Sequence, residues 1–322
     1  MGDRCVLVSG AGGFIGRWSV PALLARGYEV HAVLSGKADR DIPAELGGAT
    51  IHVADLLSDR RVAELMDEVN PTHLLHFAWI ATPGLYWSSP ENFRWAKASE
   101  SLLRSFCARG GRRVLMAGTC AEYDWSRASE CDELQSPLAD DTAASVSPYA
   151  ACKMALQRTL AEFGRRERIS TAWGRIFFQF GPHEHPDRLV PSVIRNLLQD
   201  REAPCSQGTQ IRSFLHVADV GAAFAAVLDS GLEGPVNVGS DERIALADLI
   251  ERIARQIGRS DLVRLGARPT PATEPPLLVP RTRRLRDEVQ WRPRLTLDEG
   301  LSDTIAWWRG RLRQGAGGAS GP

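Results

Sequence analysis

Short apolar, β-branched runs alternate with longer amphipathic segments through the first half of the chain. The apolar runs predict strands at 5–10, 29–35, 49–54, 73–78, 112–118 and 170–177. The amphipathic segments between them predict helices at 14–26, 58–69, 91–109 and 148–166. Gly27, Asn70-Pro71 and Gly110-Gly111 are stop signals for three of these helices. Strands joined by helical crossovers predict a parallel sheet, and such a sheet binds ligands beyond the carboxyl ends of its strands.

Beyond about residue 178 the pattern is less regular and is interrupted by proline and glycine. Segments 213–229 and 236–239 predict a late helix and strand that return to the sheet, and 245–257 predicts a helix capped near Ser240 or Asp241. Residues 268–280 contain five prolines, which predicts an extended course. The last residues, 314–322, are rich in small residues and are expected to form a disordered tail.

These elements predict an α/β fold with a Rossmann-type, doubly wound parallel sheet and a smaller C-terminal substrate-binding lobe. In this prediction residues 1–177, with 213–239 returning to them, form the dinucleotide-binding domain. Residues 178–212 and 240–313 form the substrate-binding lobe. A chain of 322 residues, of which 43% are hydrophobic and 24% charged, is long enough for two such cooperating units.

The charges of the chain are balanced, with 39 Lys and Arg against 39 Asp and Glu. This leaves no surplus of cations to neutralise phosphate backbones or an anionic membrane, so neither nucleic acid nor a membrane is an expected partner. The N-terminus lacks the basic flank and apolar core of a signal peptide, and no stretch approaches the roughly 20 apolar residues of a membrane span. Six scattered cysteines predict reduced thiols and a cytoplasmic protein.

The first predicted strand ends in a glycine-rich turn that opens the first helix. Gly10, Gly13 and Gly16 recur at every third position, and Phe14 and Ile15 lie between the last two. Such a turn presents backbone amides and a helix N-terminus to a pyrophosphate, which indicates dinucleotide binding. An ordinary tight turn is the alternative, but the strand before it and the helix after it favour a cofactor site.

The ends of the second and third strands bear on which dinucleotide binds. An NAD site usually has a carboxylate on the ribose 2′-hydroxyl, whereas this chain has Ser35, followed by Lys37 and Arg40. A hydroxyl with basic groups nearby accommodates a 2′-phosphate, so NADP(H) is favoured over NAD(H), unless the segment is only a solvated basic loop. After the third strand, Asp55-Leu56 offers a carboxylate that either accepts a hydrogen bond from adenine or caps a helix.

Tyr149 and Lys153 form the strongest chemical signal in the sequence. Positions i and i+4 share one helix face, and Ser147-Pro148 supplies a cap and a first-turn proline in front of them. A neighbouring ammonium lowers the pKa of a tyrosine from about 10, so that the phenol exchanges a proton with a carbinol or carbonyl near neutral pH. Thr119, at the carboxyl end of the fifth strand, could hydrogen-bond a substrate oxygen, although such a threonine taken alone is usually structural.

The order of strand, glycine turn, Thr119 and the Tyr149/Lys153 pair resembles the extended short-chain dehydrogenase/reductase family. This family contains nucleotide-sugar epimerases, dehydratases and ketoreductases. The resemblance covers about residues 4–310. It continues in four further motifs, which are His76-Phe77-Ala78, Arg175 to Pro182, Arg212 to Val220 and Asn237-Val238-Gly239.

The resemblance implies roles for several of these residues. Thr119, Tyr149 and Lys153 look like the catalytic triad, in which Tyr149 exchanges the proton, Lys153 lowers its pKa and holds the nicotinamide ribose, and Thr119 steadies the reacting oxygen. Ala78 belongs to the cofactor-binding set. Arg212 resembles the arginine that clamps the diphosphate of a nucleotide sugar, a task suited to a bidentate guanidinium, and a surface arginine is the alternative.

The chain also departs from the pattern of the family. Dehydratases carry an Asp-Glu pair directly after the threonine, where this chain has Cys120 and Ala121, so a 4,6-dehydratase is not expected. Glu122 comes one place late and would point to the other face of an extended segment. The asparagine that touches substrate in relatives is Phe178 here, and Gln179, which follows it, is a candidate substrate contact.

Other residues permit two interpretations. Glu122 and Tyr123 either reach the substrate or serve the structure. A group of aromatic residues after the fourth strand forms either a pocket wall or core, namely Trp79, Tyr86, Trp87 and Trp95. His183 and His185 lack a third ligand nearby, so no metal site is expected.

Three functions are compatible with these observations. The first is NADPH-dependent reduction of a nucleotide-linked 4-keto-6-deoxyhexose, which Ser35 favours. The second is a 4-epimerase that retains NAD and returns the hydride to the other face of the sugar. The third, a non-catalytic dinucleotide sensor, would not need the complete triad. A nucleotide-diphosphate sugar is the expected partner, and the resemblance implies a homodimer formed through the helices at 91–109 and 148–166.

Overall fold

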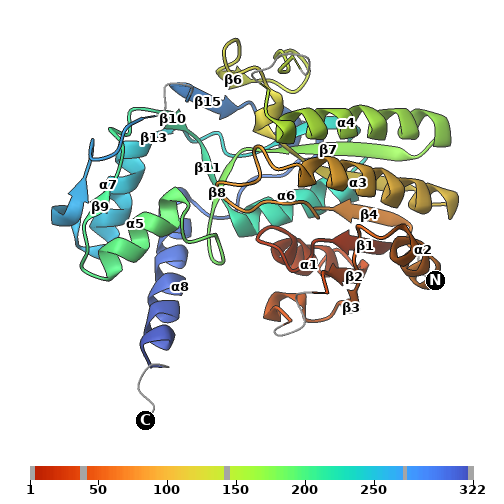
Figure 1. Ribbon diagram of the computed structural model, residues 1–322, viewed down its shortest axis with the longest axis horizontal. Helices are drawn as coiled ribbons and strands as arrows, with labels where there is room; N and C mark the ends of the chain where they lie inside the picture. Colours follow the sequence, from red (N-terminus) through yellow and green to blue (C-terminus); the bar gives the residue numbers. More distant parts are fainter. Residues whose placement is uncertain (1–3, 37–41, 141–145, 271–273, 318–322) are drawn as a thin grey trace.

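A seven-stranded parallel sheet is the main element of the fold, in the order β12-β7-β5-β4-β1-β2-β3 (Figure 1). The structure is a computed structural model that describes residues 4–36, 42–140, 146–270 and 274–317. The strands of the sheet are β1 (Cys5–Ser9), β2 (Glu29–Leu34), β3 (Thr50–Val53), β4 (His73–His76), β5 (Arg113–Thr119), β7 (Ser170–Ile176) and β12 (Gly234–Val238). The predicted strands are confirmed, with ends that differ by no more than two residues.

The central strands are buried on both sides, which explains their sequence pattern. All residues of β1 and β5 are buried. Because a parallel sheet carries helices on both faces, its central strands are continuous apolar runs and do not alternate between apolar and polar residues. The β-branched runs of the sequence therefore mark the middle of the sheet.

Helices cover both faces of this sheet (Figure 1). On one face α1 (Gly16–Leu24) packs against α6 (Val217–Asp229). On the other lie α2 (Asp59–Val69), α3 (Glu91–Ala108) and α4 (Pro148–Glu167), over a second apolar cluster. The four helices predicted in the first half are confirmed, and α4 begins as expected because the Ser147 hydroxyl accepts a hydrogen bond from the Ala150 amide.

The order of the strands reverses next to β1, and sheets of this type bind their ligands in a crevice at such a point. The chain proceeds from β1 to β2 and β3 on one side, and then crosses to β4 and β5 on the other. Such a reversal leaves an opening beyond the carboxyl ends of the two strands on either side of it, here β1 and β4. The glycine turn follows β1 and Ala78 follows β4, so both lie at this opening.

The remaining chain forms the smaller lobe, to the left in Figure 1. It contains a four-stranded sheet, β13-β10-β15-β6, and the strand pairs β11-β8 and β14-β9. Their bounds are β6 (Glu130–Cys131), β8 (Phe178–Phe180), β9 (Ala203–Pro204), β10 (Ile211–Arg212), β11 (Phe214–His216), β13 (Ile244–Ala245), β14 (Val263–Arg264) and β15 (Leu277–Pro280). Three helices pack around its own core, α5 (Leu189–Leu198), α7 (Leu246–Ile257) and α8 (Leu297–Gly317). Short turns of helix lie at Ala44–Leu46, Cys120–Glu122, Ser260–Leu262 and Arg284–Glu288.

Several expectations for the second half need correction. The predicted helix 213–229 divides into β11 and α6, because the ring of His216 caps the helix by accepting from the Ala218 amide. The helix α7 has no side-chain cap, so the expected cap at Ser240 or Asp241 is wrong. In the proline-rich segment, 277–280 is extended as predicted, and 271–273 lies outside the described residues.

The largest errors concern α5 and α8, which the sequence analysis did not predict. In α8, Leu297, Leu301, Ile305 and Trp308 are buried at helical spacing. The helix continues beyond this apolar stripe to Gly317, so residues 314–317 are helical and not the disordered tail that their composition suggested. Residues 318–322 lie outside the described part of the chain.

The β6 strand lies in sequence within the predicted first domain, but it joins the four-stranded sheet of the small lobe.

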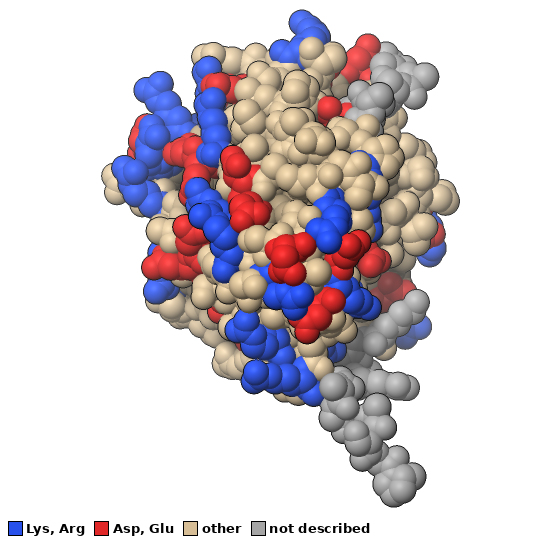
Figure 2. Space-filling model, turned by 90° about the vertical axis from the view of Figure 1, so that its left-hand side faces the viewer, with Lys and Arg blue, Asp and Glu red and all other residues tan. Residues whose placement is uncertain are grey.

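Acidic and basic side chains are interspersed over the face of the lobe shown in Figure 2. Arg252 contacts both Glu242 and Asp298, and Arg264 pairs with Glu202. This face therefore reflects the balanced composition of the chain. None of the helices in the described residues is both long enough and apolar enough to span a membrane.

Candidate active site

The glycine turn after β1 packs tightly on itself and on the end of β4. Gly10 has a φ of +67°, and a Cβ there would lie 2.8 Å from the Ala78 nitrogen. A Cβ at Gly16 would lie 2.2 Å from the Gly10 oxygen. Larger residues would therefore push the turn away from the crevice, whereas glycine allows the backbone to approach a ligand closely. Gly13 is exposed at the top of the turn.

The start of α1 is open to an anion. Its N-cap residue, Ile15, has no side-chain acceptor, so the amides of the first turn lack the usual capping partner. Phe14 and Ile15 are half-buried beside them. The sequence analysis missed Arg17, whose Nη2 donates to the Gly12 oxygen at 2.9 Å and brings a positive charge to the turn. The helix dipole, the lack of a side-chain cap and this guanidinium together fit the pyrophosphate of a dinucleotide.

The ends of β2 and β3 flank the turn. Ser35 is exposed, and Lys37 and Arg40, the basic residues expected beside it, lie outside the described residues. Asp55 is exposed and accepts from the Leu57 amide at 3.0 Å, while Leu56 is buried. Ser58 is the cap of α2, so the alternative role of Asp55 as a helix cap is wrong, and its second oxygen remains available to a ligand.

The three expected catalytic residues come together where β5 meets α4. Thr119 is the last residue of β5, and Tyr149 and Lys153 lie on the first turns of α4. Thr119 and Tyr149 share a side-chain hydrogen bond. The Lys153 ammonium is buried and donates to the Ala117 oxygen of β5 at 2.8 Å. A hydroxyl, a phenol and an ammonium therefore share one end of the sheet.

Burial shifts both titrating groups of this set. Burial raises the pKa of Tyr149 above its ordinary value, and the hydrogen bond with Thr119 acts in the opposite direction. Burial lowers the pKa of Lys153 to about 7, although the charge of Glu122 acts to raise it. Burial is the largest influence on the pKa of Tyr149 here, and the expectation that Lys153 lowers this pKa stays a prediction.

Aromatic side chains surround the triad. The rings of Tyr86 and Trp87 meet Tyr149 edge-on, with centroids 4.9 and 5.7 Å away. The Lys153 nitrogen lies 3.9 Å from the centroid of the Trp79 ring, a cation–π contact. Trp95 packs against the core beneath the sheet. Of the aromatic group singled out from the sequence, Tyr86, Trp87 and Trp79 thus contact the triad, and Trp79 also packs against the same core cluster as Trp95.

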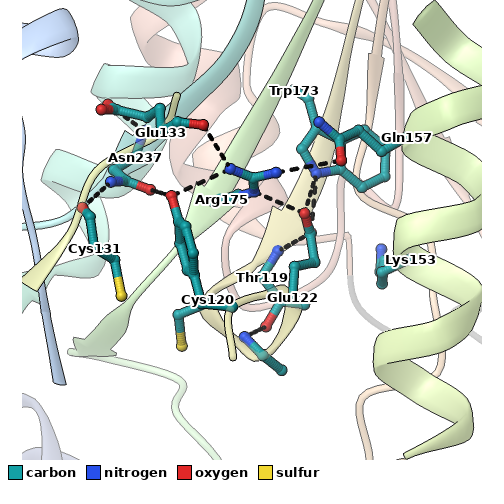
Figure 3. Close-up of polar contacts among 12 residues, drawn as sticks. Thr119, Cys120, Glu122, Cys131, Glu133, Lys153, Gln157, Trp173, Arg175 and Asn237 are labelled. Carbon is teal, nitrogen blue, oxygen red and sulfur yellow. Dashed lines mark hydrogen bonds and ion pairs between the residues drawn. The ribbon is translucent and has the colours of Figure 1, made fainter. Parts of the chain in front are cut away.

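Glu122 does not face the site, contrary to one of the two interpretations above. Its side chain is completely buried, and Figure 3 shows it turned towards Arg175. The carboxylate accepts from the Thr119 amide at 2.8 Å, from Trp173 Nε1 at 2.9 Å and from Arg175 Nε at 2.8 Å. With its oxygens committed to these donors, Glu122 holds the end of β5 in place and offers no contact to a substrate.

Tyr123 continues the same buried network, so the assignment of this residue to the substrate is also corrected. Its hydroxyl donates to Asn237 Oδ1 at 2.7 Å and accepts from Arg175 Nη1 at 3.2 Å. Asn237 Nδ2 in turn donates to the Cys131 oxygen at 2.7 Å. Arg175 begins one of the family-like motifs of the sequence, which by itself indicates no role for this residue. The signal that could have found it is a lone charge within a buried strand.

Arg212 is buried and paired, so the interpretation as a surface arginine is wrong. Its Nη2 donates to Glu274 Oε1 at 3.1 Å and to the Pro275 oxygen at 2.8 Å, and its guanidinium lies over the Phe178 ring. Gln179, on β8 next to Phe178, has a buried Oε1 without a hydrogen-bond partner among the described residues. Both residues lie in the small lobe, on β10 and β8.

The two histidines considered for a metal face different partners. His183 Nε2 pairs with Glu45 Oε1 at 3.2 Å, and its ring packs on Trp307. His185 is exposed and pairs with Asp187. Because they contact separate carboxylates, these side chains do not form a common site.

A family model described as "NAD dependent epimerase/dehydratase family" matches residues 6–239, which contain the turn, the triad and the buried network. The chain belongs to this family. Its members are enzymes that use an NAD(P) dinucleotide, which fits the glycine turn and the uncapped start of α1. The fold class and the family resemblance predicted from the sequence are thereby confirmed.

Named relatives of the family match nearly the whole chain. UDP-glucuronic acid decarboxylase 1 of Xenopus tropicalis is 25% identical, over 97% of this chain and 73% of that protein. A dTDP-glucose 4,6-dehydratase of Streptomyces niveus is 27% identical, over 94% of this chain and 92% of its own. The solved UDP-glucose 4-epimerase of Thermus thermophilus in complex with NAD is 25% identical, with a TM-score of 0.82 over 95% of this chain and 99% of that one.

Proposed function

We propose that this member of the family is a nucleotide-sugar 4-epimerase that retains NAD through its cycle. The observation that carries the proposal is a triad for reversible hydride and proton transfer, with no further acid or base offered to the site by the described residues that directly follow Thr119. Thr119, Tyr149 and Lys153 lie together, whereas the residues after Thr119 are Cys120 and Ala121. The likeness to the 4-epimerase of Thermus thermophilus, whose structure contains NAD, supports this function over a reduction.

The proposed chemistry needs one proton carrier and one oxygen ligand from the chain. Bound NAD supplies the hydride acceptor and then the hydride donor. Tyr149 takes the proton of the sugar 4-hydroxyl as the C4 hydride leaves, and returns it when the hydride comes back to the other face of C4. Thr119 hydrogen-bonds the reacting oxygen throughout. Lys153, buried beside them, provides the positive charge that favours the phenolate.

Elimination of water or of carbon dioxide would need an additional acid or base. Burial raises the pKa of the Cys120 thiol to about 12, so it stays protonated at neutral pH. Ala121 has no titratable group, and Glu122 is committed to the buried network. These features disfavour the dehydratase and decarboxylase activities for which the sequence relatives are named.

Arg212 and Gln179 are proposed to hold the diphosphate and the sugar. Arg212 presents a buried guanidinium suited to bidentate contact with phosphate oxygens, and Gln179 has an unpartnered oxygen suited to a sugar hydroxyl. Glu274 is paired with this guanidinium. A nucleotide diphosphate would therefore replace Glu274 as the counter-ion.

Reduction of a 4-keto sugar by NADPH is the second candidate, and Ser35 favours it. An exposed serine at the end of β2 offers no carboxylate to the ribose 2′-hydroxyl and would not repel a 2′-phosphate. The two functions differ in the handling of the cofactor, because an epimerase retains its dinucleotide and a reductase exchanges it in every turnover. Homodimerisation through α3 and α4 stays a prediction under either function.

The test begins with the purified protein, which is denatured so that any released dinucleotide can be identified. The native protein is then incubated separately with UDP-glucose, UDP-N-acetylglucosamine and dTDP-glucose, and the nucleotide sugars are separated by anion-exchange chromatography. The proposal expects stoichiometric NAD and a 4-epimer with no net oxidation. An empty site that prefers NADPH, with turnover only of a 4-keto sugar, would replace the epimerase by the reductase.

Tyr149→Phe tests the triad within the same assay. Removal of the proton carrier should reduce kcat by about 10²- to 10⁴-fold. The matched control is Tyr28→Phe, because the Tyr28 hydroxyl contacts Asp229 far from the triad. Equal activity of the two variants would refute the assignment of Tyr149.

A further inference from the structure

Four side chains with metal-binding atoms lie on one face of the main sheet, towards the ends of β1 and β2 that are remote from the crevice. The parallel register sets Cys5 beside Glu29, and His31 beside Leu7. On the next strand His52 is paired with Val33. Because side chains alternate along a strand, Cys5, Glu29, His31 and His52 all face the side that α2 covers.

Three of these residues can meet a single ion. One ligand atom each of Cys5, Glu29 and His31 lies within 4.8 Å of the others. Tetrahedral zinc binds thiolate at about 2.3 Å and imidazole or carboxylate at about 2.0–2.2 Å, so its ligand atoms lie roughly 3.3–3.8 Å apart. Cys5 is 4% exposed, whereas the Glu29 side chain is 57% exposed and leaves the cluster accessible from solvent.

Of the two ring nitrogens of His31, Nε2 faces Glu29 within the cluster, and Nδ1 faces His52 and, beyond it, Glu68. His31 Nε2 lies 3.3 Å from Glu29 Oε1, and His31 Nδ1 lies 2.9 Å from His52 Nε2. His52 Nδ1 in turn lies 3.4 Å from Glu68 Oε1, on α2. Metal-bound histidines almost always donate their other ring N–H to an acceptor, and such outer partners fix the tautomer of the ligand. The arrangement at His31 has this form.

We propose that Cys5, Glu29 and His31 bind Zn²⁺, and that His52 and Glu68 orient His31 for this purpose. A thiolate and an imidazole in one site select zinc over magnesium or calcium, which prefer oxygen ligands. Three protein ligands leave one position to water. No metal was expected from the sequence, where only His183 and His185 were considered as ligands. The register of the sheet is what brings Cys5, Glu29 and His31 together.

The site is separate from the proposed catalytic centre. Cys5 and Glu29 begin β1 and β2, whereas the glycine turn follows the end of β1 and Thr119, the partner of Tyr149, ends β5. The ion would join the first strand to its neighbour. Zinc therefore acts on the stability of the sheet, and the proposal does not depend on which sugar the enzyme modifies.

The test uses full-length protein without an affinity tag, after treatment with EDTA and removal of the chelator. Zn²⁺ is titrated in competition with a chromophoric chelator, and Co²⁺ is used as a spectroscopic probe of a thiolate ligand. We expect one ion per chain, a thiolate-to-cobalt charge-transfer band, and a higher Tm with zinc than with EDTA. His52→Gln should weaken zinc binding by about 10- to 100-fold, since it removes only the outer partner.

Cys5→Ser should abolish the charge-transfer band, and the matched control Cys107→Ser, at a half-buried free cysteine of α3, should retain it. Glu29→Gln keeps the proposal testable if the buried Cys5 variant does not fold, because Glu29 is exposed and its loss should weaken binding without unfolding the sheet. Absence of stoichiometric zinc binding by the wild-type protein would overturn the proposal. Undiminished binding by both Cys5→Ser and Glu29→Gln would do the same.

Discussion

Replacement of Glu122 by glutamine should destabilise the protein strongly, because it breaks a buried ion pair from one side. The Glu122 and Arg175 side chains are 0% and 2% exposed, with 2.8 Å between carboxylate oxygen and guanidinium nitrogen. Burial acts to lower the pKa of Arg175, but Glu122 and Tyr123 outweigh it and raise the pKa above its ordinary value. In Glu122→Gln this guanidinium remains buried and charged without its counter-ion.

The expected magnitude follows from the burial of the pair. Removal of one partner of a buried ion pair costs about 3–5 kcal/mol of unfolding free energy. With an unfolding entropy of about 2.1 cal/mol/K per residue, a chain of 322 residues loses roughly 1 °C of Tm for each 0.7 kcal/mol. Glu122→Gln should therefore lower the Tm by about 4–7 °C. Differential scanning calorimetry at neutral pH measures this shift.

Two further variants make the measurement decisive. Glu64→Gln removes one partner of an exposed pair with Arg60 and should leave the Tm nearly unchanged. The double variant Glu122→Leu/Arg175→Met replaces both buried charges and should recover part of the loss, because no unpaired charge remains. The reasoning is refuted if Glu122→Gln and Glu64→Gln have the same Tm, or if the double variant is no more stable than Glu122→Gln.

Three other predictions concern the site. Burial lowers the pKa of Lys153 from 10.5 to about 7, so between these two pH values the unfolded chain binds the proton more tightly than the folded protein does. The free energy of unfolding should therefore rise with pH across this window. Thermal melts at a series of pH values should show this rise for the wild type and a flatter curve for Lys153→Met. Glu274→Gln frees the Arg212 guanidinium and should tighten UDP binding several-fold by calorimetry, whereas weaker binding would contradict competition between Glu274 and phosphate. Ser35→Asp should shift the ratio of NADPH to NADH affinity towards NADH by at least tenfold in a tryptophan-quenching titration, and an unchanged ratio would remove Ser35 as a determinant.

Local pattern was sufficient to predict the sheet and the reacting groups. The strands of the main sheet and the helices of its first half are continuous or periodic apolar runs, and each periodicity belongs to one type of element. Tyr149 and Lys153 are one helical turn apart, so the sequence alone places them on one face. Gly10 and Gly16 are likewise required by a turn of a few residues. In each case the physical cause lies within a short stretch of chain.

Contacts between distant residues were decided only by the tertiary structure. The sequence allowed Glu122 to contact the substrate, but the pairing of β5 with β7 buries it beside Arg175. Arg212 pairs with Glu274, which lies in a segment that composition predicted only to be extended. The register of the first strands likewise brings Cys5 to Glu29. Sequence spacing predicts which face of an element a side chain occupies. Which partner it meets, and how far burial shifts its pKa, depends on the elements packed against that face, because desolvation and ion pairing act between neighbours in space.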